Sequence, residues 1–343
     1  MSYYHDTLTS PTDALQKIVV WLQSLGWAVN MSQASGNGWR AHLSKNNLYV
    51  NLRAFHNETA GSGFWYGSGW GIFVNLSTGF DSSKDWSVQP GSPRTWHDAN
   101  LGMRPCVKLG SAGSVCGPLN GLYCFSDEND NIIIVIEGYP GITSYLGWGN
   151  VIKVGTWTGG AYFFASNSST LGVTAPYTAG YTTIAPAPFY NGQEHAALVR
   201  IDVDNTLNQW IGVGEGSYIT TNTTDADCTT LDARIYTPLN FKSLNTLLNV
   251  PPTGIPCYGG YGNSDSSTSE FQNRLFNAGN FQHLLAPIHL YVTRAEGGYS
   301  LIGRVPKIYA CTATEHGMSL GAELVRGADH YIVFPKFAVK KVA

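Results

Sequence analysis

Charged side chains are scarce in this sequence. Lys, Arg, Asp and Glu make up 13% of the 343 residues, about half the share found in an ordinary soluble domain. Aromatic residues, glycine and uncharged polar residues take their place, with 19 Tyr, 14 Phe, 10 Trp and 39 Gly. Surfaces that are aromatic and poor in charge are typical of protein–protein interfaces. The composition therefore indicates a protein that works against neighbouring chains and argues against a freely diffusing enzyme.

The few charges show no bias toward one sign. The formal net charge is −3, with neither a basic stripe nor an acidic tail, which argues against nucleic acid and anionic membranes as partners. No run approaches the 18 apolar residues of a membrane-spanning helix. Residues 1–15 also lack the basic and apolar regions of a signal peptide. We expect a chain that is made in the cytoplasm and has no membrane partner.

Cysteine and histidine patterns of metal sites are missing. No C-x-x-C pair occurs, and no Cys and His residues stand at zinc-site spacing. We favour reduced thiols that pack as small hydrophobic groups, while cross-linking after release into an oxidising medium stays open. The six cysteines are Cys106, Cys116, Cys124, Cys228, Cys257 and Cys311.

Catalytic and cofactor motifs are missing as well. The sequence has no H-x-x-x-H, no nucleophile elbow, and no Walker A or dinucleotide fingerprint. Asp202 and Asp204 lie on one face of a predicted strand, a pattern that could form an acid–base pair or a cation site. The outward face of a half-buried strand produces the same pattern, and we favour that interpretation. We therefore expect no catalytic residues, no metal and no cofactor.

One helix is strongly indicated. The Ser-Pro-Thr-Asp segment at 10–13 supplies an N-cap, a proline at the first helical position and a carboxylate that can reach back to the cap. Apolar residues follow at helical spacing up to Gly26, which stands where a helix ends. We predict a helix over 12–25 that buries its Leu15, Ile18 and Leu22 face.

After Gly26 the apolar pattern changes to a period of two, which is typical of strands. The predicted strands cover 39–43, 48–52, 71–76, 132–136, 153–157, 161–165, 197–203, 210–213, 287–294, 299–305 and 330–337. Residues 45–47 and 158–160 are predicted hairpin turns, the second with two glycines at positive φ. The continuous branched run at 132–136 suits a strand that is buried on both faces.

These elements predict a mainly β (α+β) fold in which the N-terminal helix packs on antiparallel β-sheets. Residues 171–190 lose the alternation and gain Pro, Ala, Thr and Gly. We therefore predict a first domain at 1–170, a linker or crossing segment at 171–190, and a second β-rich domain at 191–343. A short helix is expected within 239–250.

Two Gly-rich loops, 57–71 and 251–269, contain the candidate interface residues. Aromatic side chains on such loops can anchor a subunit interface, stack on sugar rings or fold back over a core edge, and all three roles stay open. Ordering loops of this length costs conformational entropy, so we predict that a neighbouring subunit or partner orders at least one of them. The candidates are Phe64, Trp65, Tyr66, Trp70, Tyr258 and Tyr261.

Several segments of the sequence resemble segments of a known class of proteins. They are the 15–27 helix that ends in Leu-Gly-Trp, and the segments 39–43, 48–53, 77–81, 88–93, 146–149, 301–306 and 333–335. In these segments the chain resembles structural proteins of tailed bacteriophage virions, over most of its length. The resemblance implies synthesis in the host cytoplasm, a place in the virion, and contacts with copies of itself and other virion proteins. Its motifs are structural and imply no chemistry.

Two functions of different classes follow. The first is a non-enzymatic building block of the neck, tail or baseplate, assembled as a homo-oligomeric ring or around the tail axis. The alternative is a receptor- or glycan-binding fibre or tail-tip module that uses the aromatic loop at 63–71 on a host glycan. A hydrolase based on Asp202 and Asp204 is the least favoured hypothesis.

Overall fold

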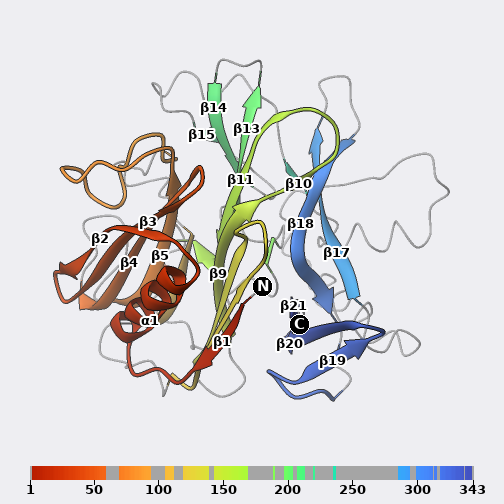
Figure 1. Cartoon of the computed structure of the whole chain (residues 1–343), viewed down its shortest axis with the longest axis horizontal. Coiled ribbons are helices and arrows are strands. Elements are labelled where there is room, and N and C mark those ends of the chain that lie inside the picture. Colours follow the sequence, from red (N-terminus) through yellow and green to blue (C-terminus); the bar gives the residue numbers. More distant parts are fainter. Residues whose placement is uncertain are drawn as a thin grey trace, which may run out of the picture.

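The structure, a computed structural model, consists of three antiparallel sheets and one helix among the residues it describes (Figure 1). The predicted mainly β fold with an N-terminal helix on antiparallel sheets is confirmed. The described residues are 2–58, 69–93, 105–111, 119–138, 143–168, 188–189, 197–203, 207–212, 219–220, 235–236, 285–293, 299–311, 313–314, 317–335 and 337–341.

The sheets lie side by side, with the central sheet in the middle of Figure 1. The central sheet has the strand order β1 (Tyr3–Asp6), β7 (Gly121–Ser126), β8 (Ile132–Glu137), β9 (Thr143–Asn150), β11 (Thr158–Ala165), β13 (Ala197–Val203), β14 (Leu207–Gly212) and β15 (Ile219–Thr220). The helix-side sheet has the order β12 (Asn167–Ser168), β6 (Pro105–Ser111), β5 (Gly69–Ser77), β4 (Leu48–Glu58), β3 (Gly38–Lys45) and β2 (Ala28–Ser35). The C-terminal sheet has the order β16 (Ile235–Tyr236), β17 (Leu285–Thr293), β18 (Tyr299–Cys311), β21 (Phe337–Lys341), β20 (Asp329–Phe334) and β19 (Glu323–Arg326), and β10 (Ile152–Lys153) pairs with β18.

The middle strands β7, β8 and β9 of the central sheet are buried on both faces. On β8, Ile132, Ile134 and Ile136 pack into the first core, which the central sheet shares with helix α1 (Pro11–Ser24) and the helix-side sheet. Ile133 and Val135 pack into the second core, against the C-terminal sheet. The prediction of a strand buried on both faces is confirmed, because successive side chains enter different cores.

The two cores absorb many of the aromatic side chains. A sheet covered on both faces needs apolar residues at nearly every position, so part of the charge deficit has an internal cause. Neighbouring chains need not explain all of it. The fully buried rings in these two cores include Trp148, Trp210, Tyr145, Tyr162, Phe163, Phe164, Phe334 and Phe337.

The start of α1 follows its sequence signal. The Ser10 side chain accepts a hydrogen bond from the Asp13 amide at 3.0 Å, as an N-cap should. The Asp13 carboxylate accepts the amide N–H of Thr9 at 2.9 Å, one residue before the cap rather than at the cap. The carboxylate therefore fixes the entry of the chain into the helix.

The end of α1 is a Schellman motif. Gly26 has a φ of 82°, and the Trp27 amide donates to the Leu22 carbonyl at 3.1 Å. Leu22 and Trp27 are both in the first core. The predicted helix is confirmed to within one residue at each end, and its predicted apolar face is buried.

The predicted hairpin between 153–157 and 161–165 is wrong. Strand β10 pairs with β18, whereas β11 pairs with β9 and β13. Gly159 and Gly160 do have positive φ angles, 91° and 103°, but they lie inside β11, where the register with β13 shifts between Gly159 and Tyr162. The glycine pair therefore forms a bulge, not a turn.

The predicted strand at 330–337 is a hairpin. Strands β20 and β21 are antiparallel and pair with Phe334 opposite Phe337, so the chain reverses direction between these two residues. The turn brings these two rings together with a centroid distance of 5.1 Å. Proline at 335 removes a backbone donor and favours a turn over a continuous strand.

The predicted boundary between two domains is crossed by one sheet. Strand β11, from the predicted first domain, pairs with β13, from the predicted second domain. The second core also joins both parts, because Tyr123 and Phe125 contact Phe334 with ring centroids 5.4 and 6.1 Å apart. The described residues of 1–170 and 191–343 thus share a sheet and a core. Residues 171–190 lie outside the described part of the chain, apart from 188–189.

Candidate functional site

The predicted interface residues fall mostly outside the described part of the chain. Phe64, Trp65 and Tyr66 lie outside it, as do Tyr258 and Tyr261.

Trp70 is described and does not belong to a loop. Strand β5 begins at Gly69, so Trp70 stands in the sheet opposite His56, with the two ring centroids 4.0 Å apart. Its half-buried ring also packs against the first core. The predicted loop therefore ends before Trp70, and sheet pairing orders this side chain within its own chain.

Of the two predicted carboxylates, Asp202 lies in β13, where its backbone pairs with Thr158 and Asn208. Asp204 lies outside the described residues. Cys124 and Cys311 are buried free thiols, as expected of cysteines that pack as small hydrophobic groups. Burial raises the pKa of the Cys124 thiol well above its ordinary value, which makes it unreactive.

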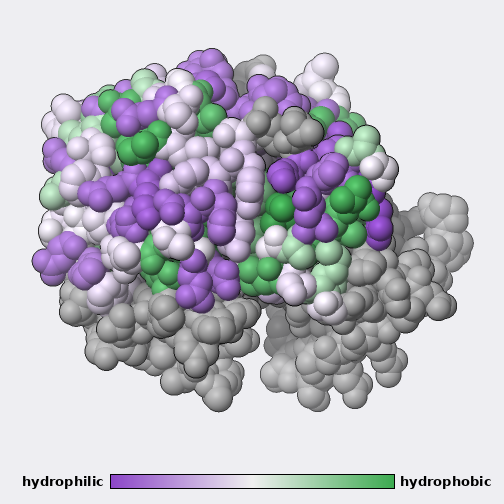
Figure 2. Space-filling view, turned by 60° about the horizontal axis from the view of Figure 1, so that its bottom comes forward, coloured by the Kyte–Doolittle hydropathy of each residue, from purple (hydrophilic) through white to green (hydrophobic). Residues whose placement is uncertain are grey.

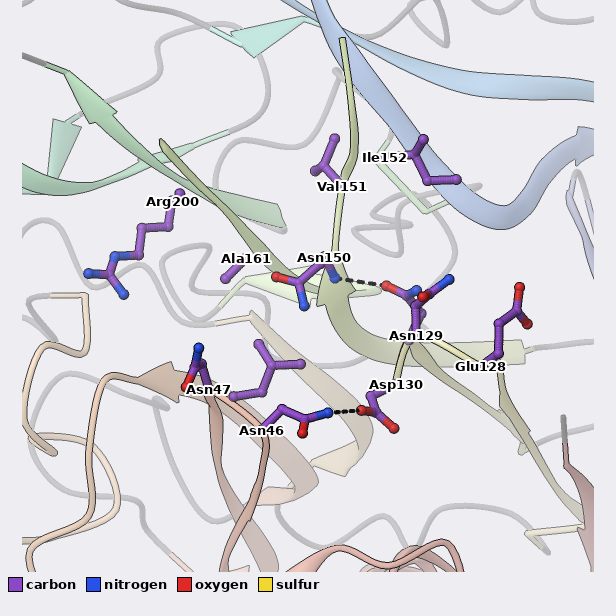
Figure 3. Close-up of a pocket in the computed structure, with 13 residues that line it drawn as sticks. Asn46, Asn47, Glu128, Asn129, Asp130, Asn150, Val151, Ile152, Ala161 and Arg200 are labelled. Atoms are coloured by element: carbon purple, nitrogen blue, oxygen red, sulfur yellow. Dashed lines mark hydrogen bonds between the residues drawn. The ribbon is translucent and has the colours of Figure 1, made fainter. Parts of the chain in front are cut away.

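One cavity among the described residues is an open polar groove of about 640 Å³ (Figure 3). This volume lies within the range of roughly 300–1,000 Å³ that ligand sites occupy. Loops and strand ends of all three sheets form its walls. The lining residues are Asn46, Asn47, Leu48, Glu128, Asn129, Asp130, Asn131, Asn150, Val151, Ile152, Gly159, Ala161 and Arg200.

The β7–β8 turn forms one wall, and the buried carboxylate of Asp127 holds it in shape. One Asp127 oxygen accepts the amides of Asn129 and Asn131, each at 2.9 Å. The Asn131 side-chain amide donates to the same carboxylate at 2.8–2.9 Å. An Asx turn with this many hydrogen bonds to one carboxylate fixes the backbone of the wall.

Asn131 connects this turn to the central sheet. Its side-chain oxygen accepts the Asn150 amide at 2.8 Å and the Tyr162 hydroxyl at 3.2 Å. A Cβ at Gly149 would collide with the Asn131 side chain. Glycine at 149 therefore makes room for the buried amide behind the groove, which gives the Leu-Gly-Trp-Gly segment a structural reason.

Asp130 joins the two opposite walls. Its carboxylate accepts hydrogen bonds from the Lys45 ammonium group at 2.7 Å and the Asn46 side chain at 2.6 Å, both from the β3–β4 hairpin. Asn46 and Asp130 have φ angles of 52° and 61°, in the left-handed region where Asn and Asp are the most tolerated side chains after glycine. The contacts of Asp130 with Lys45 and Asn46 thus set the distance between the two walls.

A second polar cluster lies on the helix-side sheet, under residues 78–93. His42, Asn51 and Asn75 stand side by side on β3, β4 and β5, and all three are at least 97% buried. His42 Nδ1 and Asn51 Oδ1 are 2.7 Å apart. Within the described part of the chain, neither His42 Nε2 nor the Asn75 side-chain amide has a hydrogen-bond partner. Such atoms cost stability, so the cluster is a weak point of the sheet.

We predict that acid weakens the folded chain through His42. Burial lowers the pKa of His42 below its ordinary value of 6.5; the Asn51 hydrogen bond and Asp85 oppose that shift, and Arg40 adds to it. Because the unfolded chain then binds the proton more tightly, stability is lost as the pH falls below about 6.5. Denaturant unfolding at pH 7.5 and pH 5.0 should show a larger loss for the native chain than for His42→Gln. Equal losses would exclude His42 as the cause.

Metal and membrane sites find no support in the described residues. No three His, Cys, Asp or Glu side chains converge there as metal ligands. No helix in the described part of the chain is long and apolar enough to cross a bilayer.

No protein-family model and no curated protein sequence matches the chain.

The sequence analysis did not predict the groove. The one available signal was the density of Asn and Asp at 46–47 and 127–131, which by itself indicates only turns. That two such turns face each other across a cavity follows from the packing of two sheets.

Proposed function

We propose that this chain is a non-enzymatic structural protein of a tailed-phage virion, placed at the neck, tail or baseplate. It assembles there through contacts with copies of itself and with other virion proteins. The sequence resemblance supports the virion setting, and one surface feature supports assembly by protein–protein contacts.

That feature is strand β2 at the edge of the helix-side sheet, on the left of Figure 1. Its sequence, Ala-Val-Asn-Met-Ser-Gln-Ala-Ser, has neither charge nor proline, and none of its residues is buried. No described strand pairs with its outer edge. Soluble monomers usually protect such an edge with Lys, Pro or short strand length. A bulge between Val29 and Met31 disturbs only the first part of β2, so Met31–Ser35 is a regular template for a further strand.

The face drawn in Figure 2 does not offer a broad apolar alternative among its described residues. Figure 2 shows one face on which hydrophilic residues dominate and hydrophobic ones form small separate groups. The backbone of an open edge, not an apolar patch, is therefore the stronger basis for assembly. The exposed large hydrophobic residues are Tyr3, Val20, Val88, Ile152, Val154, Leu301 and Val325.

The proposal is tested by mass spectrometry of gradient-purified particles of the parent phage. The chain should be present at a fixed stoichiometry relative to the other tail proteins. Its absence from intact particles would remove the proposed function. Receptor or glycan binding through the aromatic loop stays a separate prediction, because only Trp70 of that loop is described and its ring packs on its own sheet.

We predict that Ala34→Lys blocks assembly without unfolding the subunit. Ala34 is exposed on β2, and a lysine there places an unpaired charge on the edge that a neighbouring strand would cover. Particle incorporation of the variant, scored in a phage that lacks the native copy, should fall at least about tenfold, while the melting temperature stays unchanged. Val20→Lys is the matched control, because Val20 is 66% exposed on α1, away from the edge. Normal incorporation of Ala34→Lys would show that β2 is not an assembly edge.

A further inference from the structure

We propose that the polar groove binds a neutral polyhydroxylated ligand of the kind a surface glycan offers. This inference goes beyond the proposed structural role and relies on different residues. It also differs from the aromatic-loop hypothesis, because no aromatic side chain is among the described residues that line the groove.

The first argument is the hydrogen-bonding chemistry of the walls. Figure 3 shows Asn46 and Asn47 on one side, Glu128, Asn129 and Asp130 on the other, and Asn150 between them. The side chains of Asn47, Asn129 and Asn150 are exposed and make no hydrogen bond to any described residue. Each amide offers both donors and an acceptor. A sugar hydroxyl also donates and accepts, so a set of free amides matches a polyol better than it matches an ion.

The second argument is charge. The groove has two carboxylates, and each already has a lysine partner. Asp130 lies 2.7 Å from the Lys45 ammonium group, and Glu128 lies 3.6 Å from that of Lys307. An anion would face these carboxylates, and a cation would have to compete with both lysines. Arg200 lies on the opposite side of the groove from Glu128. Because both carboxylates are already paired with lysines, the lining favours an uncharged ligand over a cation.

The third argument is preorganisation. Asp127 and Asn131 fix the turn that carries Asn129. The Asn131 side-chain oxygen accepts a hydrogen bond from the backbone N–H of Asn150 and so holds the backbone at that residue. Walls that are rigid before binding reduce the entropy lost when a ligand is captured. Ile152 is 42% exposed and adds apolar surface, against which the C–H face of a pyranose ring can pack.

The test uses the purified full-length chain on a printed array of neutral and acidic oligosaccharides. The neutral set comprises di- to tetrasaccharides of glucose, galactose, rhamnose and N-acetylglucosamine, and the acidic set contains uronic acids or sialic acid. The strongest binder is then titrated by calorimetry. We expect binding to neutral members. The double variant Asn129→Ala/Asn150→Ala should weaken the affinity by about tenfold or more, because two exposed amides that contact the ligand are lost.

The control is Gln16→Ala, which removes an exposed side-chain amide on α1, outside the groove. Its affinity should equal that of the native chain, and all variants should melt at the native temperature. The proposal is overturned if no neutral oligosaccharide binds, if acidic ones are preferred, or if binding survives the double substitution. Glycan binding by a chain that is absent from virions would remove the proposed function alone. A chain that is present in virions but binds no glycan would remove this inference alone.

Discussion

Replacing Trp148 by alanine is expected to lower the free energy of unfolding by about 3–5 kcal/mol. Trp148 is completely buried in the first core, and its ring lies edge-on to that of Trp27 at a centroid distance of 6.0 Å. Trp27 follows the helix end, so this contact links α1 to the central sheet. The truncation leaves a cavity where two layers meet, which the surrounding strands can fill only in part. Chemical denaturation followed by circular dichroism measures the loss.

Trp148→Phe is the matched control. The Trp148 indole N–H is buried and has no hydrogen-bond partner among the described residues, so phenylalanine keeps an aromatic ring and removes a donor without a described partner. We expect phenylalanine to cost clearly less than alanine. If alanine costs under about 1 kcal/mol, Trp148 does not connect the layers, since a deep core truncation of this size should not be so mild.

A fragment of residues 1–170 is expected not to fold cooperatively. It keeps α1 and the helix-side sheet, but it lacks β13 to β15 and all strands of the C-terminal sheet except β10. The second-core face of the central sheet, with Tyr145 and Phe164 among its members, would then lie in water. Each Å² of apolar surface contributes about 25 cal/mol to the free energy of folding when it is buried. Exposing this face should therefore remove most of the stability of a marginally stable fold.

The fragment is compared with the full chain by near-ultraviolet circular dichroism and by binding of a hydrophobic dye. Lost aromatic signal and strong dye binding are expected for the fragment alone. A fragment that unfolds in one sharp transition, at the denaturant concentration of the full chain, would restore the predicted boundary at 171–190.

Local signals predicted the elements that depend on local interactions. The cap residues at 10–13 and Gly26 are sufficient to place α1, because the hydrogen bonds that end a helix come from neighbours in sequence. The turn at Asn46 is similar, since the left-handed φ of 52° needs a residue such as Asn. The continuous branched run at 132–136 predicted burial on both faces, because it places apolar side chains on both sides of the strand.

Pairing between distant strands could not be predicted in this way. Whether β10 joins β11 or β18 depends on which layer lies beside it, and Lys153 is opposite Gly303, 150 positions later. The glycine pair at 159–160 has the backbone freedom of a turn and of a bulge alike. The shared sheet that crosses the predicted domain boundary was missed because the composition of 171–190 reports local backbone preference alone. The groove arises from the same long-range packing.

The composition also needs a narrower interpretation than the sequence suggests. Many aromatic residues and few charges indicate contacts with neighbouring chains, yet the two internal cores contain many of these rings. Internal burial does not explain why β2, an exposed edge strand of the described chain, has no charged residue. The case for assembly therefore depends on eight residues of surface rather than on the whole chain.

Cryo-microscopy of the parent particle tests the central claim most directly. The account predicts density for this three-layer subunit at the neck, tail or baseplate, with a strand of a neighbouring subunit paired along Met31–Ser35. A particle map in which no density fits this fold, or in which β2 faces open solvent while the contacts lie elsewhere, would contradict it.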